Sequence, residues 1–263
     1  MTEQPVLLTV DKRGVATVTL NRPHVNNAYN GDLIDGVLGA LNALERRRDL
    51  RVVVLRGAGR HFQAGADLTW IREVARQDAT ANERVSLATA EAVRRLNEAA
   101  CVTVALIQGA CIGGGTGIAA ACDVVVAAED AFFAISETRW GLMAGIVVPQ
   151  LIDAMGARQV RRYALTGERF DAAEARRVGL VHEVVPGDQL EAAGERIVDS
   201  ILMNAPDATM QTKRRTLLVA QSMLDVSTVD KLAREHAGKR RSAEATEGLA
   251  SFAEKRKPSW YPG

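Results

Sequence analysis

The sequence predicts an α/β protein whose C-terminal part is helical. Over the first 150 residues, short apolar segments of strand composition alternate with segments of helical period, and this alternation is typical of α/β architecture. Strand signals nearly vanish after about residue 150, and residues 188–255 are helical in pattern almost throughout. We therefore expect a core over residues 1–200. A helical region over residues 201–263 would extend the same domain or pack on a neighbouring subunit.

The individual elements follow from local patterns. Val6–Val10 and Val15–Leu20 flank Asp-Lys-Arg-Gly, which predicts a hairpin with Gly14 in the turn. Leucine and valine recur at helical spacing over residues 31–47, which indicates an amphipathic helix. Further strands are expected at Arg51–Leu55, Val102–Ile107 and Val124–Ala127, and a further helix at residues 81–98. Asp171 and Glu174 have the form of a helix N-cap with its capping-box partner, and Gly179 suits the end of that helix.

Composition narrows the class of function. Lysine plus arginine (33) almost balances aspartate plus glutamate (32), so the chain has no long-range field suited to nucleic acid or an anionic membrane. Apolar runs such as Val102–Ile107 are too short to span a bilayer, and the first residues do not resemble a secretory signal. The three cysteines form no CxxC pair and the four histidines lack metal-ligand spacing. We expect a cytoplasmic protein with reduced thiols and no metal site.

Two glycine-containing loops, each directly after a strand, are the candidates for chemistry. The first is HFQAGADL at residues 61–68 and the second is QGACIGGGTGIAAACD at residues 108–123. Glycine allows a ligand to approach the backbone closely, and a helix that begins in such a turn presents unpaired N–H groups. Two such loops side by side could direct two N–H donors at one oxygen, as an oxyanion hole requires. Each loop alone could equally be a tight turn.

A dinucleotide site is the competing interpretation of the second loop. Residues 115–120 follow a strand and resemble a GxGxxA fingerprint. That unit usually stands near the start of its domain, with an acidic residue about 20 positions further on. Here the nearest acids after the next strand are Glu129 and Asp130, barely a dozen residues away. The pattern therefore disfavours a nicotinamide enzyme.

The two loops, in this order, resemble the paired signatures of the crotonase (enoyl-CoA hydratase/isomerase) superfamily. Three further segments match over nearly the whole chain: LNRP with Asn27-Ala28, the segment LTGERFDA with Gly179-Leu180-Val181, and ASFAEKRKP near the C-terminus. The resemblance implies a crotonase-type spiral of ββα turns with a C-terminal helical region, assembled as a homotrimer or homohexamer. It also implies an acyl-CoA thioester as the substrate and no metal, flavin or nicotinamide cofactor.

Carried over residue by residue, the resemblance places the two oxyanion-hole N–H groups at Ala66 and Gly114, and the general acid/base at Glu137. Preorganised donors of this kind stabilise an enolate most where its charge has developed. Many hydratases of the family carry a second glutamate three residues after the middle glycine, where this chain has Gly117. One carboxylate is chemically sufficient for a double-bond isomerase, because it can remove a proton and return it elsewhere.

The segment ETRWGL at residues 137–142, with Ile146 and Pro149 after it, resembles a branch that hydrates branched, carboxylated enoyl-CoAs such as methylglutaconyl-CoA. That branch also tends to have glycine at the position of Gly117. We therefore predict an enoyl-CoA hydratase, with an isomerase that uses Glu137 alone and a non-catalytic CoA-binding protein as alternatives.

The implied substrate site is formed by His24, Val25, Asn26, Ala28, Ala64, Asp67, Leu68, Gly113, Arg139, Trp140 and Met143, with Lys255 and Lys257 at the CoA phosphates. Several of these have a structural interpretation as well. Asp67 fits a turn or helix cap, Arg139 a salt bridge, and Trp140 and Met143 core packing. The two lysines fit a solvated basic helix end.

Overall fold

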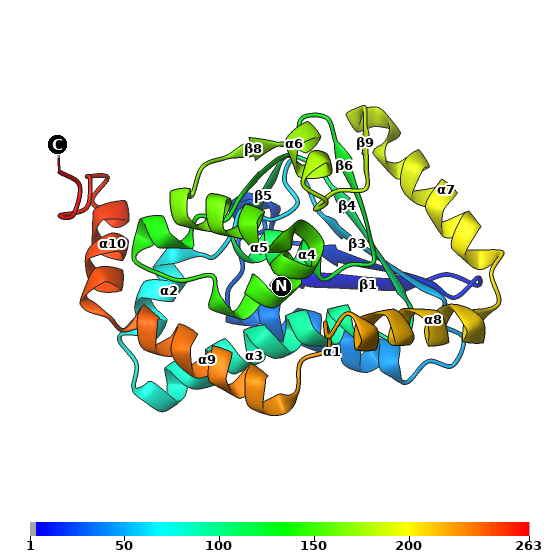
Figure 1. Ribbon diagram of the computed structural model, residues 1–263, viewed down its shortest axis with the longest axis horizontal. Helices are drawn as coiled ribbons and strands as arrows, with labels where there is room; N and C mark the ends of the chain where they lie inside the picture. The colour runs from blue at the N-terminus through cyan, green and yellow to red at the C-terminus, as the bar shows by residue number, and fades with distance from the viewer. Residues whose placement is uncertain (1–3, 263) are drawn as a thin grey trace.

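The α/β prediction is confirmed by the computed structural model, which describes residues 4–262. A six-stranded sheet has the order β1-β2-β3-β4-β6-β9, and a second sheet has the order β5-β7-β8. Helices cover both sheets, and the C-terminal helices run along one side of the molecule (Figure 1). Three apolar clusters fill the spaces between these layers.

The large sheet begins with the predicted hairpin. β1 (Val6–Val10) pairs antiparallel with β2 (Val15–Leu20), and Gly14 between them has φ +78°. A Cβ at Gly14 would lie 2.0 Å from the carbonyl oxygen of Asp49, so the turn needs glycine for both its conformation and its contact. β3 (Val52–Gly57), β4 (Val102–Ile107) and β6 (Val124–Ala128) then follow in parallel, as buried strands of valine and isoleucine do in α/β proteins.

The small sheet shows how the chain spirals. β5 (Ala110–Ile112) follows β4, and β7 (Phe132–Ala134) follows β6. In these two turns the chain adds one strand to each sheet before it enters a helix, as the ββα spiral requires. The structure also contains two short strands after residue 150, where the sequence shows almost no strand signal: β8 (Phe170–Asp171) and β9 (Glu183–Val185). They have two and three residues, too few for a period-2 pattern to be visible.

The helices expected at residues 31–47, at residues 81–98, after Asp171 and within residues 188–255 are present, together with others that the local pattern does not predict. Their bounds are α1 (Gly31–Glu45), α2 (Leu68–Ala75), α3 (Ala79–Asn97), α4 (Gly114–Ala120), α5 (Val148–Thr166), α6 (Ala172–Arg177), α7 (Leu190–Leu202), α8 (Pro206–Val219), α9 (Val226–Arg240) and α10 (Ala243–Ala253). Four 3₁₀ turns lie between them: η1 (Pro23–Val25), η2 (Glu137–Trp140), η3 (Gly145–Val147) and η4 (Gly187–Gln189). Asp171 caps α6 by accepting from the Glu174 N–H, as predicted. The Glu174 carboxylate does not reach back to the cap, because it accepts hydrogen bonds from Arg177 and Tyr163.

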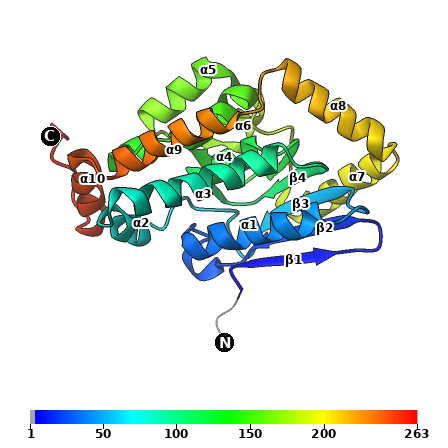
Figure 2. The same ribbon diagram turned by 90° about the horizontal axis from the view of Figure 1, so that it is seen from below.

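The C-terminal helices pack on their own chain. α9 lies against α3, and α10 contacts both α2 and η2 (Figure 2). The contact with η2 is close because a Cβ at Gly248 would lie 2.3 Å from the carbonyl carbon of Trp140. A Cβ at Gly141, where φ is +67°, would likewise meet the Glu244 carbonyl at 2.3 Å. The helical region therefore forms part of the wall around η2, while its predicted role in oligomerisation stays a prediction.

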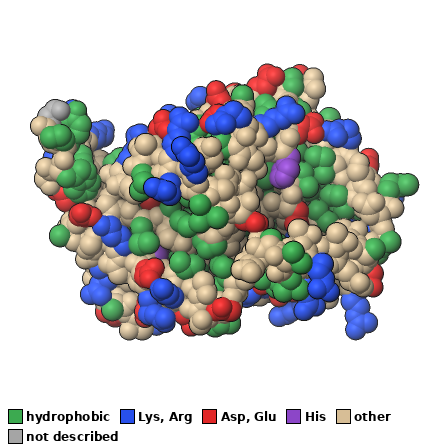
Figure 3. Space-filling view, in the orientation of Figure 1, with side chains coloured by type: hydrophobic (Ala, Val, Ile, Leu, Met, Phe, Trp, Pro, Cys, Tyr) green, Lys and Arg blue, Asp and Glu red, His purple; other side chains and the backbone are tan. Residues whose placement is uncertain are grey.

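The surface agrees with the balanced composition. On the face shown in Figure 3, basic and acidic side chains are interspersed and form no large area of one sign. Across residues 4–262, none of the helices combines the length and apolar character that a membrane crossing demands.

Candidate active site

Three loops that lie far apart in the sequence are brought side by side by the small sheet. Gln63 pairs in parallel with Cys111, and Cys111 pairs in parallel with Phe133. Ala66 and Gly114 each lie three residues beyond their paired positions, and Glu137 lies four residues beyond its own. Adjacent parallel segments end at the same edge of a sheet, so this register alone places the three predicted catalytic positions next to one another.

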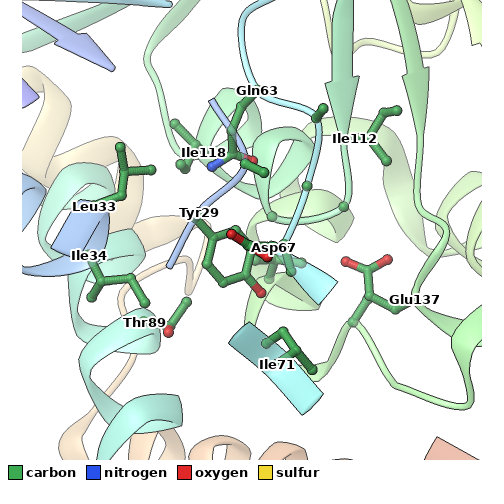
Figure 4. Close-up of a pocket in the computed structure, with 18 of the residues that line it drawn as sticks. Tyr29, Leu33, Ile34, Gln63, Asp67, Ile71, Thr89, Ile112, Ile118 and Glu137 are labelled. Atoms are coloured by element: carbon green, nitrogen blue, oxygen red, sulfur yellow. The ribbon is translucent and has the colours of Figure 1, made fainter. Parts of the chain in front are cut away.

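These loops line a cavity of about 490 Å³ (Figure 4), a volume typical of small-molecule sites. The cavity extends from η2 to the space between α1, α3 and α9, and its deeper walls are mainly leucine, isoleucine and valine. The predicted site residues that line it are Val25, Asn26, Ala28, Ala64, Ala66, Asp67, Leu68, Gly113, Gly114, Glu137, Arg139, Trp140 and Met143.

Two backbone N–H groups at the cavity wall have no acceptor among residues 4–262. Gly113 N–H donates to Ala134 and Asp67 N–H donates to Tyr29. By contrast, the N–H groups of Ala66 and Gly114 donate to no group in the described part of the chain. Ala66 lies just before α2, which Asp67 caps through the Trp70 N–H as predicted, and Gly114 is the first residue of α4. The two loops touch, because a Cβ at Gly113 would lie 3.8 Å from the Gly65 Cα.

The loop predicted to bind CoA is joined to the first glycine loop by hydrogen bonds. Ala64 N–H donates to the Asn26 carbonyl, and Tyr29 N–H donates to the Gly65 carbonyl. The buried Asn27 side chain accepts from the Arg22 N–H and donates to the carbonyls of Ala58 and His61. These bonds hold the backbone of residues 26–29 in position beside Ala66.

Glu137 is half-buried and faces the same cavity. Its Oε1 would lie 3.0 Å from a Cβ at Gly113, and within residues 4–262 its water-inaccessible Oε2 has no hydrogen-bond partner. Burial raises the pKa of Glu137 to about 7, and the hydrogen bond with its own backbone N–H opposes this rise. A carboxyl with a pKa near neutrality can both accept and return a proton at physiological pH.

Gly117 is excluded from a catalytic role by packing as well as by chemistry. It is buried in α4 against η3, and a Cβ there would lie 2.2 Å from Cγ1 of Val147. A glutamate at this position would therefore displace Val147 from the core. The structure thus has one carboxylate where many hydratases of the family have two.

We expect Gly117→Ala to lower the free energy of unfolding by about 1–3 kcal/mol, as overpacking of a core does. The added methyl group has no room beside Val147, so a Gly117→Ala/Val147→Ala double variant should recover part of the loss. Urea denaturation measures both effects. Gly39→Ala in α1 is the matched control, because nothing lies within 4 Å of its added Cβ. Equal unfolding midpoints for the two single variants would show this packing argument to be wrong.

Some predicted residues lie away from the cavity. His24, Lys255 and Lys257 are exposed and do not line it, and Lys257 lies over the Tyr261 ring, 3.6 Å from the centroid. Their contact with CoA stays a prediction. Arg139 lines the cavity but is exposed, and its side chain packs on Gly167. Trp140 packs edge-on against Phe252 of α10. It therefore lines the cavity and also contacts α10.

Sequence reasoning missed several polar residues that line the cavity, among them Tyr29, Gln63, His236 and Arg240. A signal for the last two is present in α9, where the buried positions Val229, Ala233, His236, Ala237 and Arg240 have helical spacing. An arginine on such a face is unusual enough to suggest a function. The four histidines lack metal-ligand spacing, so their positions along the chain gave no signal for His236. From residue 4 to 262, no group of three or more histidine, cysteine, aspartate or glutamate residues is placed to hold a metal ion.

Comparison with known proteins agrees with the fold. The family model described as enoyl-CoA hydratase/isomerase matches residues 11–262. A crystal structure of an enoyl-CoA hydratase from Mycobacterium avium superposes with a TM-score of 0.85 at 31% identity, covering 98% of this chain and 100% of that one. The mitochondrial Δ(3,5)-Δ(2,4)-dienoyl-CoA isomerase of Dictyostelium discoideum is 31% identical over 94% of this chain and 88% of its own. The mevalonyl-coenzyme A hydratase of Aspergillus fumigatus is 31% identical over 99% and 96%.

The family match and these relatives identify an enzyme of the hydratase/isomerase class. The chain belongs to the enoyl-CoA hydratase/isomerase family, the crotonase superfamily. Its relatives include both hydratases and an isomerase, so membership by itself leaves the reaction open between these two.

Proposed function

We propose that this protein is an enoyl-CoA hydratase that adds water across the 2,3 double bond of a branched or carboxylated enoyl-CoA. The observation that carries the proposal is the pair of unpaired N–H groups at Ala66 and Gly114, beside the raised-pKa carboxyl of Glu137. The thioester carbonyl would lie between the two donors. No other cofactor is needed in this scheme, since polarisation of the carbonyl makes C3 electrophilic.

In the proposed step, the water oxygen forms a bond to C3 while the C2–C3 π bond breaks. The electron pair moves to the thioester oxygen, where the two N–H groups stabilise the enolate. Glu137 accepts the proton that the water loses and then delivers a proton to C2, which regenerates the carbonyl. Because the same carboxylate accepts and returns a proton, the reaction needs no second acid at position 117.

Residues at the cavity wall and near the C-terminus are proposed to bind the CoA part of the substrate. The backbone of Val25, Asn26 and Ala28 at the cavity wall would follow the pantetheine, and the exposed His24, Lys255 and Lys257 would meet the CoA nucleotide in a homotrimer or homohexamer. The mevalonyl-coenzyme A hydratase among the relatives supports a branched acyl group. We also place the enzyme in the cytoplasm.

An isomerase is the second candidate, because the one carboxylate and the isomerase relative favour it. It would move a proton between carbons of a 3-enoyl-CoA without adding water.

Purified protein should lower the ultraviolet absorbance that the conjugated double bond of a 2-enoyl-CoA contributes, and it should add the mass of one water to the thioester. Crotonyl-CoA and a branched enoyl-CoA are the test substrates, and a 3-enoyl-CoA is the comparison. A gain of conjugation from the 3-enoyl-CoA with no mass change would assign the isomerase instead. Binding of these thioesters without any change in absorbance or mass would reject both reactions in favour of a CoA-binding protein.

A further inference from the structure

The deep end of the cavity, between α3 and α9, contains a buried polar cluster that the proposed hydration does not use. Ser86 of α3 and His236 and Arg240 of α9 form it. The Ser86 hydroxyl lies 2.9 Å from Nδ1 of His236. Arg240 Nη2 donates to both of these atoms, at 3.1 Å each. His236 and Arg240 line the cavity, whereas Ser86 does not.

The charge of Arg240 is not neutralised by a carboxylate. The side chain is 1% exposed, and within the described residues it takes part in no salt bridge. Its Nη1 has only long contacts of 3.5 Å with Asn82, and its Nε has no partner among residues 4–262. A buried cation without a counterion is costly, and proteins usually pair it. This chain keeps the charge at the wall of a cavity that an acyl chain is proposed to enter.

His236 lies between the Arg240 charge and the cavity, because it contacts Arg240 through Nδ1 and also lines the cavity. Burial lowers the pKa of His236 to about 3, and the charge of Arg240 acts in the same direction, so the imidazole is neutral. Because Nδ1 accepts from Arg240, the proton of the ring is on Nε2. In the part of the chain that the structure describes, no acceptor contacts Nε2. A neutral ring that accepts from a cation is polarised and becomes a stronger donor at its other nitrogen.

Tyr29 connects this end of the cavity with the catalytic end. Burial raises the pKa of its hydroxyl to about 12; the charge of Arg240 opposes the rise and that of Glu137 adds to it. Tyr29 thus lies within electrostatic reach of both residues. Its ring contacts Gly114, where a Cβ would lie 2.8 Å from Cε1, and Figure 4 shows it in the middle of the cavity, between Glu137 and the Leu33–Ile34 side.

We propose that His236 and Arg240 form a subsite for a carboxylate at the far end of the acyl chain. In this arrangement the carboxylate accepts from Nε2–H of His236, and Arg240 behind the ring supplies the counter-charge. The preferred substrates are then CoA thioesters of dicarboxylic acids. The inference rests on the proposed function in one respect, that an acyl thioester occupies this cavity. It assigns the acyl carboxylate to the buried Arg240 instead of Arg139, whose side chain is exposed.

Saturated thioesters test the subsite without any turnover. Calorimetric titration of the purified protein should show tighter binding of a dicarboxylic acyl-CoA than of the monocarboxylic acyl-CoA of equal length, by about tenfold to hundredfold, as hydrogen bonds to charged groups imply. The pairs are glutaryl-CoA with pentanoyl-CoA, adipoyl-CoA with hexanoyl-CoA, and suberoyl-CoA with octanoyl-CoA. The monoamide of adipoyl-CoA, which has the same shape without the charge, should bind like hexanoyl-CoA.

The variants separate this role from a structural one. Arg240→Met should abolish the preference at the best chain length and leave hexanoyl-CoA binding within a few-fold of the parent protein. Arg234→Met, an exposed position on the same helix, should retain the preference. His236→Phe removes the donor but keeps Arg240, so it should reduce the preference even if Arg240→Met does not fold. Circular dichroism and thermal unfolding verify that each variant is folded.

The outcomes distinguish the two proposals. Equal binding within every pair, or a preference that survives in folded Arg240→Met or His236→Phe, would overturn the subsite and leave the hydratase untouched. Binding of the monoamide as tightly as adipoyl-CoA would also overturn it, because the site would then recognise a neutral oxygen. A dicarboxylic preference in a protein that hydrates no enoyl-CoA would support the subsite while rejecting the hydratase.

Discussion

Glu137→Gln is expected to lower kcat by about 10²–10⁴-fold, the usual contribution of a positioned general acid/base. Glutamine preserves the shape of the side chain beside Gly113 but cannot accept a proton from water or return one to C2. Turnover of crotonyl-CoA and a branched enoyl-CoA measures the loss. Binding of a saturated acyl-CoA should change little, because the substitution leaves the cavity wall and the two N–H donors in place.

The pH dependence of kcat/KM should show the ionisation of Glu137. Glu137 must be ionised to accept a proton, and burial raises its pKa to about 7. We therefore expect kcat/KM of the parent protein to rise with pH up to a plateau, with an apparent pKa near 7. The residual activity of the glutamine variant should lack this rising limb.

The free energy of unfolding provides a second measurement of the Glu137 pKa. It should fall with rising pH, whereas kcat/KM should rise. The folded-state pKa of about 7 lies above the ordinary value of 4.5, so the folded protein binds more protons than the unfolded chain between these two pH values. The parent protein is therefore expected to lose stability as pH rises from 4.5 to 7, by about 3 kcal/mol for a rise of this size at about 1.4 kcal/mol per pKa unit. Glu137→Gln should escape this loss and unfold at a higher temperature than the parent at pH 8.

The matched control is Glu235→Gln, an exposed glutamate on α9, which should change neither turnover nor the pH profile. If Glu137→Gln turned over substrate as fast as the parent protein, Glu137 would not be the acid/base, and the proposed mechanism would have to be abandoned.

Gly114→Pro is expected to lower kcat/KM by about 10²–10³-fold relative to Gly114→Ala, the typical cost of one lost oxyanion-hole donor. Proline lacks the backbone N–H, and the first position of a helix is the one at which this loss is best tolerated. Gly114 occupies that position in α4. The comparison with alanine is essential because any Cβ at Gly114 approaches the Tyr29 ring to 2.8 Å. The alanine variant carries that contact but keeps the donor.

Initial rates with crotonyl-CoA, together with binding of a saturated acyl-CoA, separate the two effects. The crowding against Tyr29 should affect both variants alike, whereas the missing donor should appear mainly in kcat, since it stabilises the enolate more than the ground-state carbonyl. Equal kcat/KM for folded proline and alanine variants would mean that the Gly114 N–H does not bind the thioester oxygen.

Much of the fold was predictable from local patterns. The hairpin around Gly14, the buried valine-rich strands and the helix at residues 31–47 were all expected and confirmed, because period-2 and period-3.6 patterns are properties of neighbouring residues. The short strands β8 and β9 were not, because segments of two or three residues carry no readable period and owe their conformation to the strands beside them.

The positions of the site loops were also predictable, through the ordered glycine motifs and their resemblance to one family. The structure brings Ala66, Gly114 and Glu137 to one edge of the small sheet by the parallel register of three segments. No pattern within a single loop indicates that register, because it is a property of pairing across the sheet.

By itself, the sequence determined the α/β class, the family and the loops that meet at the site, since these depend on short-range patterns and ordered motifs. Only the tertiary structure decided that Gly117 has no room for a second carboxylate beside Val147, and that α9 brings Arg240 to the cavity with no counterion from the described part of the chain. Both facts depend on which atoms of distant segments come within a few ångströms of one another. Packing sets those distances, and the order of residues along the chain does not display them.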